Sequence, residues 1–227
     1  MSFEPAEAAV GRRARLVDVA ALAVLAAAML GGEYLASWIA AREGLAVSRG
    51  MVFEGVWVAD SWERFPWADC AAMLFFMAAL PVAWEAARGR GWRTVGLGAG
   101  RKALWAIAAG LAVAAAVYGL RSRAGLVRDT HPARLMILLS YFAVVAIAEE
   151  AAFRGVIQRR TRDLFGVPAA LVVAAAAFTA WHGFDAPAGI IALRSVAGLV
   201  FGIAYVYTGG LAAPIVWHWA LDMALAL

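Results

Sequence analysis

Apolar residues run in long stretches along this chain, separated by short polar connections. Seven such stretches can be drawn, and most approach the roughly 20 residues that a helix needs to cross a membrane. They cover about residues 18–40, 67–87, 103–120, 134–164, 168–182, 189–208 and 212–227. No sustained alternation of apolar and polar residues suggests a barrel. The pattern predicts an all-α fold, a polytopic transmembrane helix bundle of about seven spans (six to eight).

The composition supports this assignment. Of the 227 residues, 64% are hydrophobic and only 16% are charged, whereas about a quarter of a soluble domain is charged. The net charge of +4 is explained by arginines beside the spans, which contact lipid headgroups, so no nucleic-acid partner is expected. The first apolar run is too long for a cleavable signal peptide, and we expect it to stay as a helix. The single cysteine, Cys70, is expected to serve in packing.

Three parts of the chain are expected. Residues 1–17 form a cytoplasmic N-terminal segment, 18–133 hold the N-terminal transmembrane helices and loops, and 134–227 hold the helices that carry the candidate chemistry. The arginines of the first segment favour a cytoplasmic N-terminus, and so do those near residues 88–102 and 159–162. The arginines of the loop at 121–134 would then lie outside, which argues against this orientation. We predict a multi-pass protein of a bacterial inner (plasma) membrane.

Charged and ionisable side chains inside the spans are the main exceptions to the apolar pattern. A charge at the centre of a membrane helix costs about 2.5–3.5 kcal/mol, so such residues are usually paired or functional. The candidates are Glu33, Glu149, Glu150, Arg154, His182, Arg194, His218 and Asp222. Six of them fall in three short stretches.

The first stretch is Glu149-Glu150-Ala-Ala-Phe-Arg154. Residues four apart share one face of a helix, so Glu150 is expected to lie over Arg154 and to be neutralised by it. Glu149 points about 100° away and has no local partner. A desolvated carboxylate without a cation can exchange protons near neutral pH. The alternative is that both acids bind arginines of neighbouring helices.

The second and third stretches each place a histidine one helical turn from a partner. In "FTAWH", Phe178 could form the wall of a pocket that His182 enters; alternatively, His182 is an interhelical hydrogen-bonding group. In "HWALD", Asp222 could accept the N–H of His218 and orient its ring, or the pair could simply hold the last helix in place. The third histidine, His131, precedes a proline in a loop and looks incidental.

Together the three stretches describe one possible chemistry. A carboxylate beside an imidazole can polarise a water molecule. A second imidazole with a short polar side chain can stabilise the oxyanion that forms when water attacks a carbonyl. Gathered in one polar cavity of the bundle, these groups would hydrolyse an amide without a covalent intermediate.

The ordered set Glu-Glu-x-x-x-Arg, Phe-x-x-x-His and His-x-x-x-Asn/Asp resembles the CPBP family, the CAAX-protease and bacteriocin-processing (Abi) proteins that include Rce1-type endopeptidases. The motifs stand at 149–154, 178–182 and 218–222, and the resemblance covers about 134–227. It implies a metal-independent intramembrane glutamic endopeptidase without a cofactor, with a conical cavity open to cytosol and membrane. Seven spans would make it a shorter, bacterial-type member.

The resemblance also implies roles for individual residues. Glu149 and His182 would activate the hydrolytic water, and His218 with Asp222 would form the oxyanion site. Glu150 and Arg154 would hold the catalytic helix in place. Asp222 stands where Asn is frequent; because an ionised aspartate repels an oxyanion, it must be protonated or act by orienting His218.

Other mechanisms remain as alternatives. Two histidines with Glu and Asp could bind zinc, although H-E-x-x-H is absent. A rhomboid-like serine mechanism lacks G-x-S-x-G, and an aspartyl protease would need a second aspartate in a span. From a different class, the buried groups could serve a proton-relay transporter, or the protein could be a membrane immunity or maturation factor.

The sequence leaves the substrate and the oligomeric state open. The expected partners are the lipid bilayer and a membrane-associated peptide or protein, whose cleavage would mature a precursor, release an anchor or remove a C-terminal sorting segment. Glu33 and Arg194 lie outside the three motifs; they could pair with each other or line the cavity, and no catalytic role is assigned to them.

Overall fold

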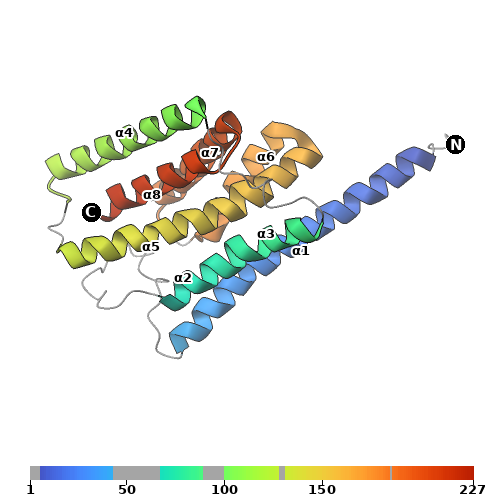
Figure 1. The fold of residues 1–227 in the computed structure, drawn as a ribbon, viewed down its shortest axis with the longest axis horizontal. Coiled ribbons are helices and arrows are strands. Elements are labelled where there is room, and N and C mark those ends of the chain that lie inside the picture. The colour runs from blue at the N-terminus through green and yellow to red at the C-terminus, as the bar shows by residue number, and fades with distance from the viewer. Residues whose placement is uncertain (1–5, 43–66, 89–99, 128–130, 185) are drawn as a thin grey trace.

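The structure is a computed structural model that describes residues 6–42, 67–88, 100–127, 131–184 and 186–227. Every regular element in these ranges is a helix (Figure 1). Most of the polar connection between the first two apolar stretches, residues 43–66, lies outside the described residues, and so does Arg128 of the loop at 121–134. The predicted all-α fold is confirmed.

The N-terminal part consists of two long helical rods. Helix α1 spans Ala6–Arg42, and the second rod runs through α2 (Trp67–Met73), a π-helical segment η2 (Leu74–Ala79) and α3 (Leu80–Ala87). The two rods pack against each other, and the N-terminal turns of α1 project beyond the rest of the bundle (Figure 1). At 1.5 Å per residue, α1 is about 55 Å long, which exceeds the thickness of the hydrocarbon core.

The C-terminal part holds the three motifs. Its elements are α4 (Arg101–Arg123), α5 (Pro132–Glu150), the π-helical segment η4 (Ala151–Gln158), α6 (Arg159–Trp181), α7 (Ala188–Thr208) and α8 (Ala212–Ala226). The last helix packs against α4, α5 and α7, and α6 packs against η4 and α7. This arrangement brings residues from α5, α6 and α8 together.

A sharp turn divides the longest apolar stretch, which runs from residue 135 to 181. Gly166 has φ +83°, a left-handed conformation that glycine adopts without a side-chain clash. Pro168 follows at the start of the returning helix, where its missing N–H costs nothing. The boundary predicted between 164 and 168 is therefore the place where the chain reverses.

The helices suit a membrane bundle. Among the described residues, five stretches are long and apolar enough to cross a bilayer: 16–36, 67–87, 101–123, 135–181 and 188–208. The stretch at 135–181 contains the reversal at Gly166, and α8 has only 15 residues. The helical membrane bundle is thus supported, but the predicted count of about seven spans is not confirmed.

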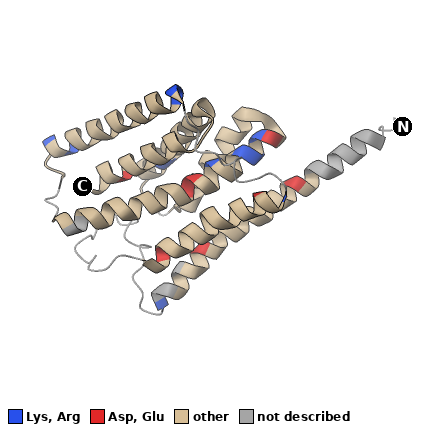
Figure 2. Cartoon of the chain, viewed as in Figure 1, with Lys and Arg blue, Asp and Glu red and all other residues tan. Residues whose placement is uncertain are grey.

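One apolar core connects the two parts. It includes Met29 of α1, Met77 of η2, Phe153 of η4 and Phe178 of α6, all almost fully buried. Cys70 is buried in the same core, as expected for a packing residue. Figure 2 shows basic residues near helix ends, while acidic residues also occur along the rods and in the middle of the bundle.

Candidate active site

Glu149 and Glu150 are the last two residues of α5, directly before the π-helical segment η4. A π-helical turn has a wider ring than an α-helical one and occurs often at functional sites. Although the helix changes from α to π between these residues, Arg154 Nη1 donates to Glu150 Oε1 at 2.8 Å. Both side chains are fully buried. The pairing expected from the four-residue spacing is present.

Glu149 is buried in a different environment. Its side chain is 4% exposed, and Trp181 forms a side-chain hydrogen bond with the carboxylate. Its Oε2 atom is buried and has no hydrogen-bond partner within the described part of the chain. This atom lies 3.7 Å from Nε2 of His182 and 3.8 Å from Nε2 of His218. One oxygen of Glu149 therefore faces both imidazoles.

The backbone determines which nitrogen of His182 carries the proton. His182 caps the C-terminal end of α6, and its Nδ1 lies 2.8 Å from the carbonyl oxygen of Phe178. A carbonyl oxygen only accepts hydrogen bonds, so Nδ1–H must donate. In the neutral ring the lone pair is then on Nε2, the atom that faces Glu149. This tautomer can accept a hydrogen bond from water.

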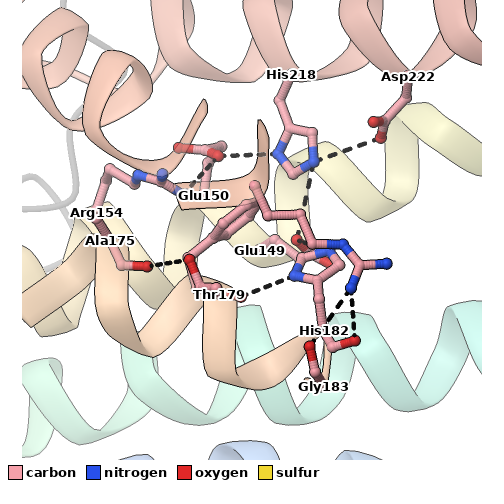
Figure 3. A network of polar contacts seen from close by, with 11 residues as sticks. Glu149, Glu150, Arg154, Ala175, Thr179, His182, Gly183, His218 and Asp222 are labelled. Atoms are coloured by element: carbon pink, nitrogen blue, oxygen red, sulfur yellow. Dashed lines mark hydrogen bonds and ion pairs between the residues drawn. The ribbon is translucent and has the colours of Figure 1, made fainter. Parts of the chain in front are cut away.

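Glu150 also orients His218, which lies on α8. Its Nδ1 is 2.9 Å from Glu150 Oε1, the same oxygen that accepts from Arg154 (Figure 3). An ionised carboxylate only accepts, so Nδ1 of His218 donates. Nε2 of this ring therefore bears a proton only in the imidazolium form, which the Glu150 carboxylate stabilises.

Asp222 lies on the other side of His218, with Oδ2 at 3.4 Å from Nε2 (Figure 3). The predicted four-residue pairing on α8 is present, but the short orienting contact to this ring comes from Glu150. The side chains of Asp222 and His182 are 24% and 20% exposed, whereas Glu149 and His218 are each 4% exposed. Access to the site is therefore from the side of His182 and Asp222.

Aromatic rings surround the two imidazoles. The centroid of Phe178 lies 4.5 Å from that of His182 and 5.6 Å from that of His218, and Phe201 stacks on His218 at 5.1 Å. The guanidinium carbon of Arg154 lies 4.8 Å from the Phe178 ring centre. Phe178 thus contacts both histidines and the buried cation, a larger role than the pocket wall expected from its spacing.

Two hydrogen bonds connect the helix of the glutamates to α7. Arg154 Nη2 donates to the carbonyl oxygen of Gly198 at 2.9 Å, and Gln158 Nε2 donates to that of Gly202 at 2.9 Å. The two glycines are four residues apart, a spacing that allows membrane helices to approach closely. A Cβ atom on Gly202 would lie 2.9 Å from Oε1 of Gln158, and one on Gly198 would lie 3.1 Å from the backbone of Ala175 on α6. The glycines thus let Arg154 and Gln158 reach backbone carbonyls.

Sequence reasoning gave no catalytic role to the second arginine inside the spans, Arg194 of α7. It is buried, and its Nη1 donates to the carbonyl oxygens of His182 at 3.0 Å and Gly183 at 3.5 Å. These carbonyls follow the end of α6, where no further helical N–H is available to them. The only signal in the sequence was a lone arginine inside an apolar helix. Its suggested pairing with Glu33, a buried residue of α1, stays a prediction.

The structure brings together the seven residues that the three motifs contain: Glu149, Glu150, Arg154, Phe178, His182, His218 and Asp222. Three further contacts were not evident from spacing: Glu150 with His218, Trp181 with Glu149, and Arg194 with His182. Their partners lie far apart in the sequence, or one of them is a residue type that gives no functional signal. Among the described residues, no three His, Cys, Asp or Glu side chains form a metal-binding group. Metal independence nevertheless stays a prediction.

The comparison with protein families identifies this part of the chain. Residues 131–224 match the family described as Type II CAAX prenyl endopeptidase Rce1-like. The match covers these helices, so this part of the chain is similar to the Rce1-like family. All three motifs fall within the match, so the resemblance to CPBP proteins is confirmed. No curated protein and no solved structure matched the chain.

The apolar helices indicate a multi-pass membrane protein, and its Rce1-like part is similar to a family of CAAX-type proteases. The cluster around Glu149 lies inside this domain and contains groups that can act as bases and as hydrogen-bond donors.

Proposed function

We propose that this protein is an intramembrane glutamic endopeptidase of a bacterial inner membrane. In this proposal, residues 134–227 form the catalytic part and the N-terminus is cytoplasmic. The observation that supports it most strongly is the buried Oε2 of Glu149, which faces Nε2 of both His182 and His218. An acceptor without a donor beside two imidazoles is a suitable place for a hydrolytic water.

In the first step Glu149 acts as a general base. Its carboxylate takes a proton from water while Nε2 of His182, whose Nδ1–H is held by Phe178, accepts the other water hydrogen. The water oxygen bonds to the carbonyl carbon of the substrate, and the carbonyl oxygen becomes an oxyanion. Holding the water between two fixed acceptors aligns its lone pair with the carbonyl, which lowers the entropic part of the barrier.

In the second step the tetrahedral intermediate collapses. Nε2–H of His218 in its imidazolium form donates to the oxyanion, and the Glu150–Arg154 pair holds the other side of that ring. The carbon–nitrogen bond breaks, and Glu149 returns its proton to the leaving amine. Asp222 acts in the protonated form, or orients His218, because a second negative charge would repel the oxyanion.

The proposed substrate is a membrane-associated protein or peptide that reaches the site from the side of His182 and Asp222, where the cluster is partly exposed. Cleavage would mature a precursor, release an anchor or remove a C-terminal sorting segment. The family name supports action on C-terminal segments.

The test is cleavage by the purified full-length protein in lipid nanodiscs, with a library of internally quenched peptides. We expect Glu149→Gln to slow cleavage by about 10³-fold and His182→Ala to slow it strongly, while chelators leave it unchanged. Loss of activity in chelator with recovery on adding zinc would favour a metalloprotease instead. If both variants cleave as fast as wild type, or if no peptide is cleaved but protons move across the bilayer, the protease proposal is wrong.

Comparing the termini of membrane proteins in cells that express wild type or Glu149→Gln would then identify the substrate. New termini that appear only with wild type would mark the cleavage sites.

A further inference from the structure

A second polar site lies at the end of the bundle where the two N-terminal rods meet the turn after η4. A cavity of about 380 Å³ is lined there by residues of α1, α3 and α6. None of its lining residues belongs to the cluster around Glu149. The volume is in the range of cavities that hold small ligands, so this space is large enough for a phosphate-containing headgroup.

The lining has two kinds of surface. Leu22, Leu25 and Trp84 supply apolar contacts, while arginines and acids from α1, α3 and α6 supply the charges. A tryptophan beside charged groups is typical of the boundary between hydrocarbon and headgroups. The cavity also lies where α3 ends, at Ala87. Both observations favour an amphipathic occupant at the membrane interface.

Most charges around the cavity are paired within the protein. Arg88 and Asp18 form an ion pair at 3.0 Å, and Arg160 pairs with Glu85, to which its Nε donates at 2.8 Å. Asp163 accepts from Arg160 at 3.5 Å. These pairs neutralise the acids that line the cavity.

Arg159 is the exception. It lines the cavity, yet no ion pair to it occurs within the ranges that the structure describes, and its Nη1 atom is buried without a hydrogen-bond partner there. A buried donor without an acceptor is costly, and a guanidinium fits the oxygens of a phosphate in a two-pronged geometry. The cavity therefore offers one unmatched cation to an anionic group.

We propose that this cavity binds the headgroup of an acidic phospholipid, with the phosphate on Arg159 and the upper acyl chain against Leu22, Leu25 and Trp84. The apolar wall favours a lipid over a soluble phosphate. The lining has three arginines and three acids, so the preference for an acidic headgroup over a zwitterionic one rests on Arg159, the lining arginine that pairs with none of these acids. Basic pockets between membrane helices commonly bind such lipids.

The experiment is native mass spectrometry of the full-length protein, purified in detergent and given dioleoyl phosphatidylglycerol or dioleoyl phosphatidylcholine. We expect at least about a fivefold preference for phosphatidylglycerol, since one charge near a membrane surface changes binding by roughly this factor. Arg159→Gln should remove the preference, and Arg159→Lys should keep most of it.

Arg162→Gln is the matched control, because Arg162 lies on the same turn, is 41% exposed, pairs with Asp163 and does not line the cavity. It should bind phosphatidylglycerol like wild type. Equal retention of the two lipids, or equal losses in Arg159→Gln and Arg162→Gln, would overturn the proposal. Full displacement of the lipid by glycerol phosphate would also overturn it, because the site would then recognise a soluble anion.

Discussion

Two groups of buried acids show how differently one membrane bundle can treat a carboxylate. Three acids of the N-terminal rods, Glu33, Asp69 and Glu85, are at most 2% exposed. In the Rce1-like domain Glu149 and Glu150 are also buried, at 3% and 0%. Glu85 is paired with Arg160, and Asp69 accepts a long hydrogen bond from Tyr141 at 3.5 Å. These contacts satisfy acids where two rods meet their neighbours.

Around Glu150 the same kind of ion pair has a second partner. The oxygen that binds Arg154 also accepts from His218, and the neighbouring Glu149 leaves Oε2 facing two imidazoles. Burial alone therefore does not mark a reactive acid. Two features distinguish the site. The Glu150–Arg154 ion pair also orients His218, and the neighbouring Glu149 has a carboxylate oxygen that accepts no hydrogen bond within the described residues.

The largest expected effect is on the rate of peptide cleavage, which should differ between variants of Glu149 and Glu33. Glu149→Gln removes the base, and we expect peptide cleavage to fall by about 10³-fold, within the range for general-base catalysis. The measurement is initial rate in nanodiscs at equal concentrations of folded protein. Glu33→Gln is the matched control, the same isosteric change at a buried glutamate of α1, and it should leave the rate close to wild type. Equal losses in both variants would mean that burial, and not catalysis, explains the effect.

The second expected effect concerns the two ion pairs. Arg154→Met leaves Glu150 as an uncompensated buried charge, which should lower stability by about 3–5 kcal/mol. Arg160→Met should cost less, because the Arg160 side chain is 13% exposed and Arg154 is fully buried. Thermal unfolding in one detergent compares the two. A larger loss in Arg160→Met would contradict the assignment of Arg154 as the more deeply buried cation.

A double variant tests the second role of Glu150. Glu150→Leu with Arg154→Met replaces a buried ion pair by apolar groups, a change that is often neutral for stability. We expect stability to recover but activity to stay low, because His218 loses the acceptor of its Nδ1–H. Recovery of both would show that the pair serves the fold alone.

The sequence predicted the helices and the members of the site better than their contacts. Long apolar runs define spans directly, and the gap between the stretches at 134–164 and 168–182 marked the place where the chain reverses. The four-residue spacings correctly predicted the pairs Glu150–Arg154 and His218–Asp222. The contact between Glu150 and His218 depends on how α8 packs against α5, and no local pattern encodes that packing. The π-helical geometry after Glu150 was also not evident from spacing.

Arg194 should have a smaller and more specific effect. It holds the carbonyl oxygens of His182 and Gly183, so Arg194→Met should displace the imidazole and lower kcat by about 10- to 100-fold, the scale of small misplacements. KM should change little, because the substrate does not contact this residue in the proposed mechanism. Arg194→Lys should restore part of kcat, and Arg162→Met is the control. A rise in KM with unchanged kcat would instead place Arg194 in substrate binding.

The smallest expected effect is at Asp222, the last position of the His-x-x-x-Asn/Asp motif that the sequence resembles. An amide of nearly the same shape can donate an N–H to the oxyanion without needing a proton from solution, whereas a carboxylate must first be protonated. Asp222→Asn should therefore keep activity within about threefold of wild type at neutral pH. This decrease is much smaller than the one seen when a hydrogen-bond donor to an oxyanion is removed. Rates should also decline less than those of wild type as pH rises, because the amide does not ionise.

The activity of Asp222→Ala, which has neither a donor nor a partner for His218, should fall by about 10²-fold. If Asn were as damaging as Ala, Asp222 would act through its negative charge, and its task would be to hold His218 as an imidazolium.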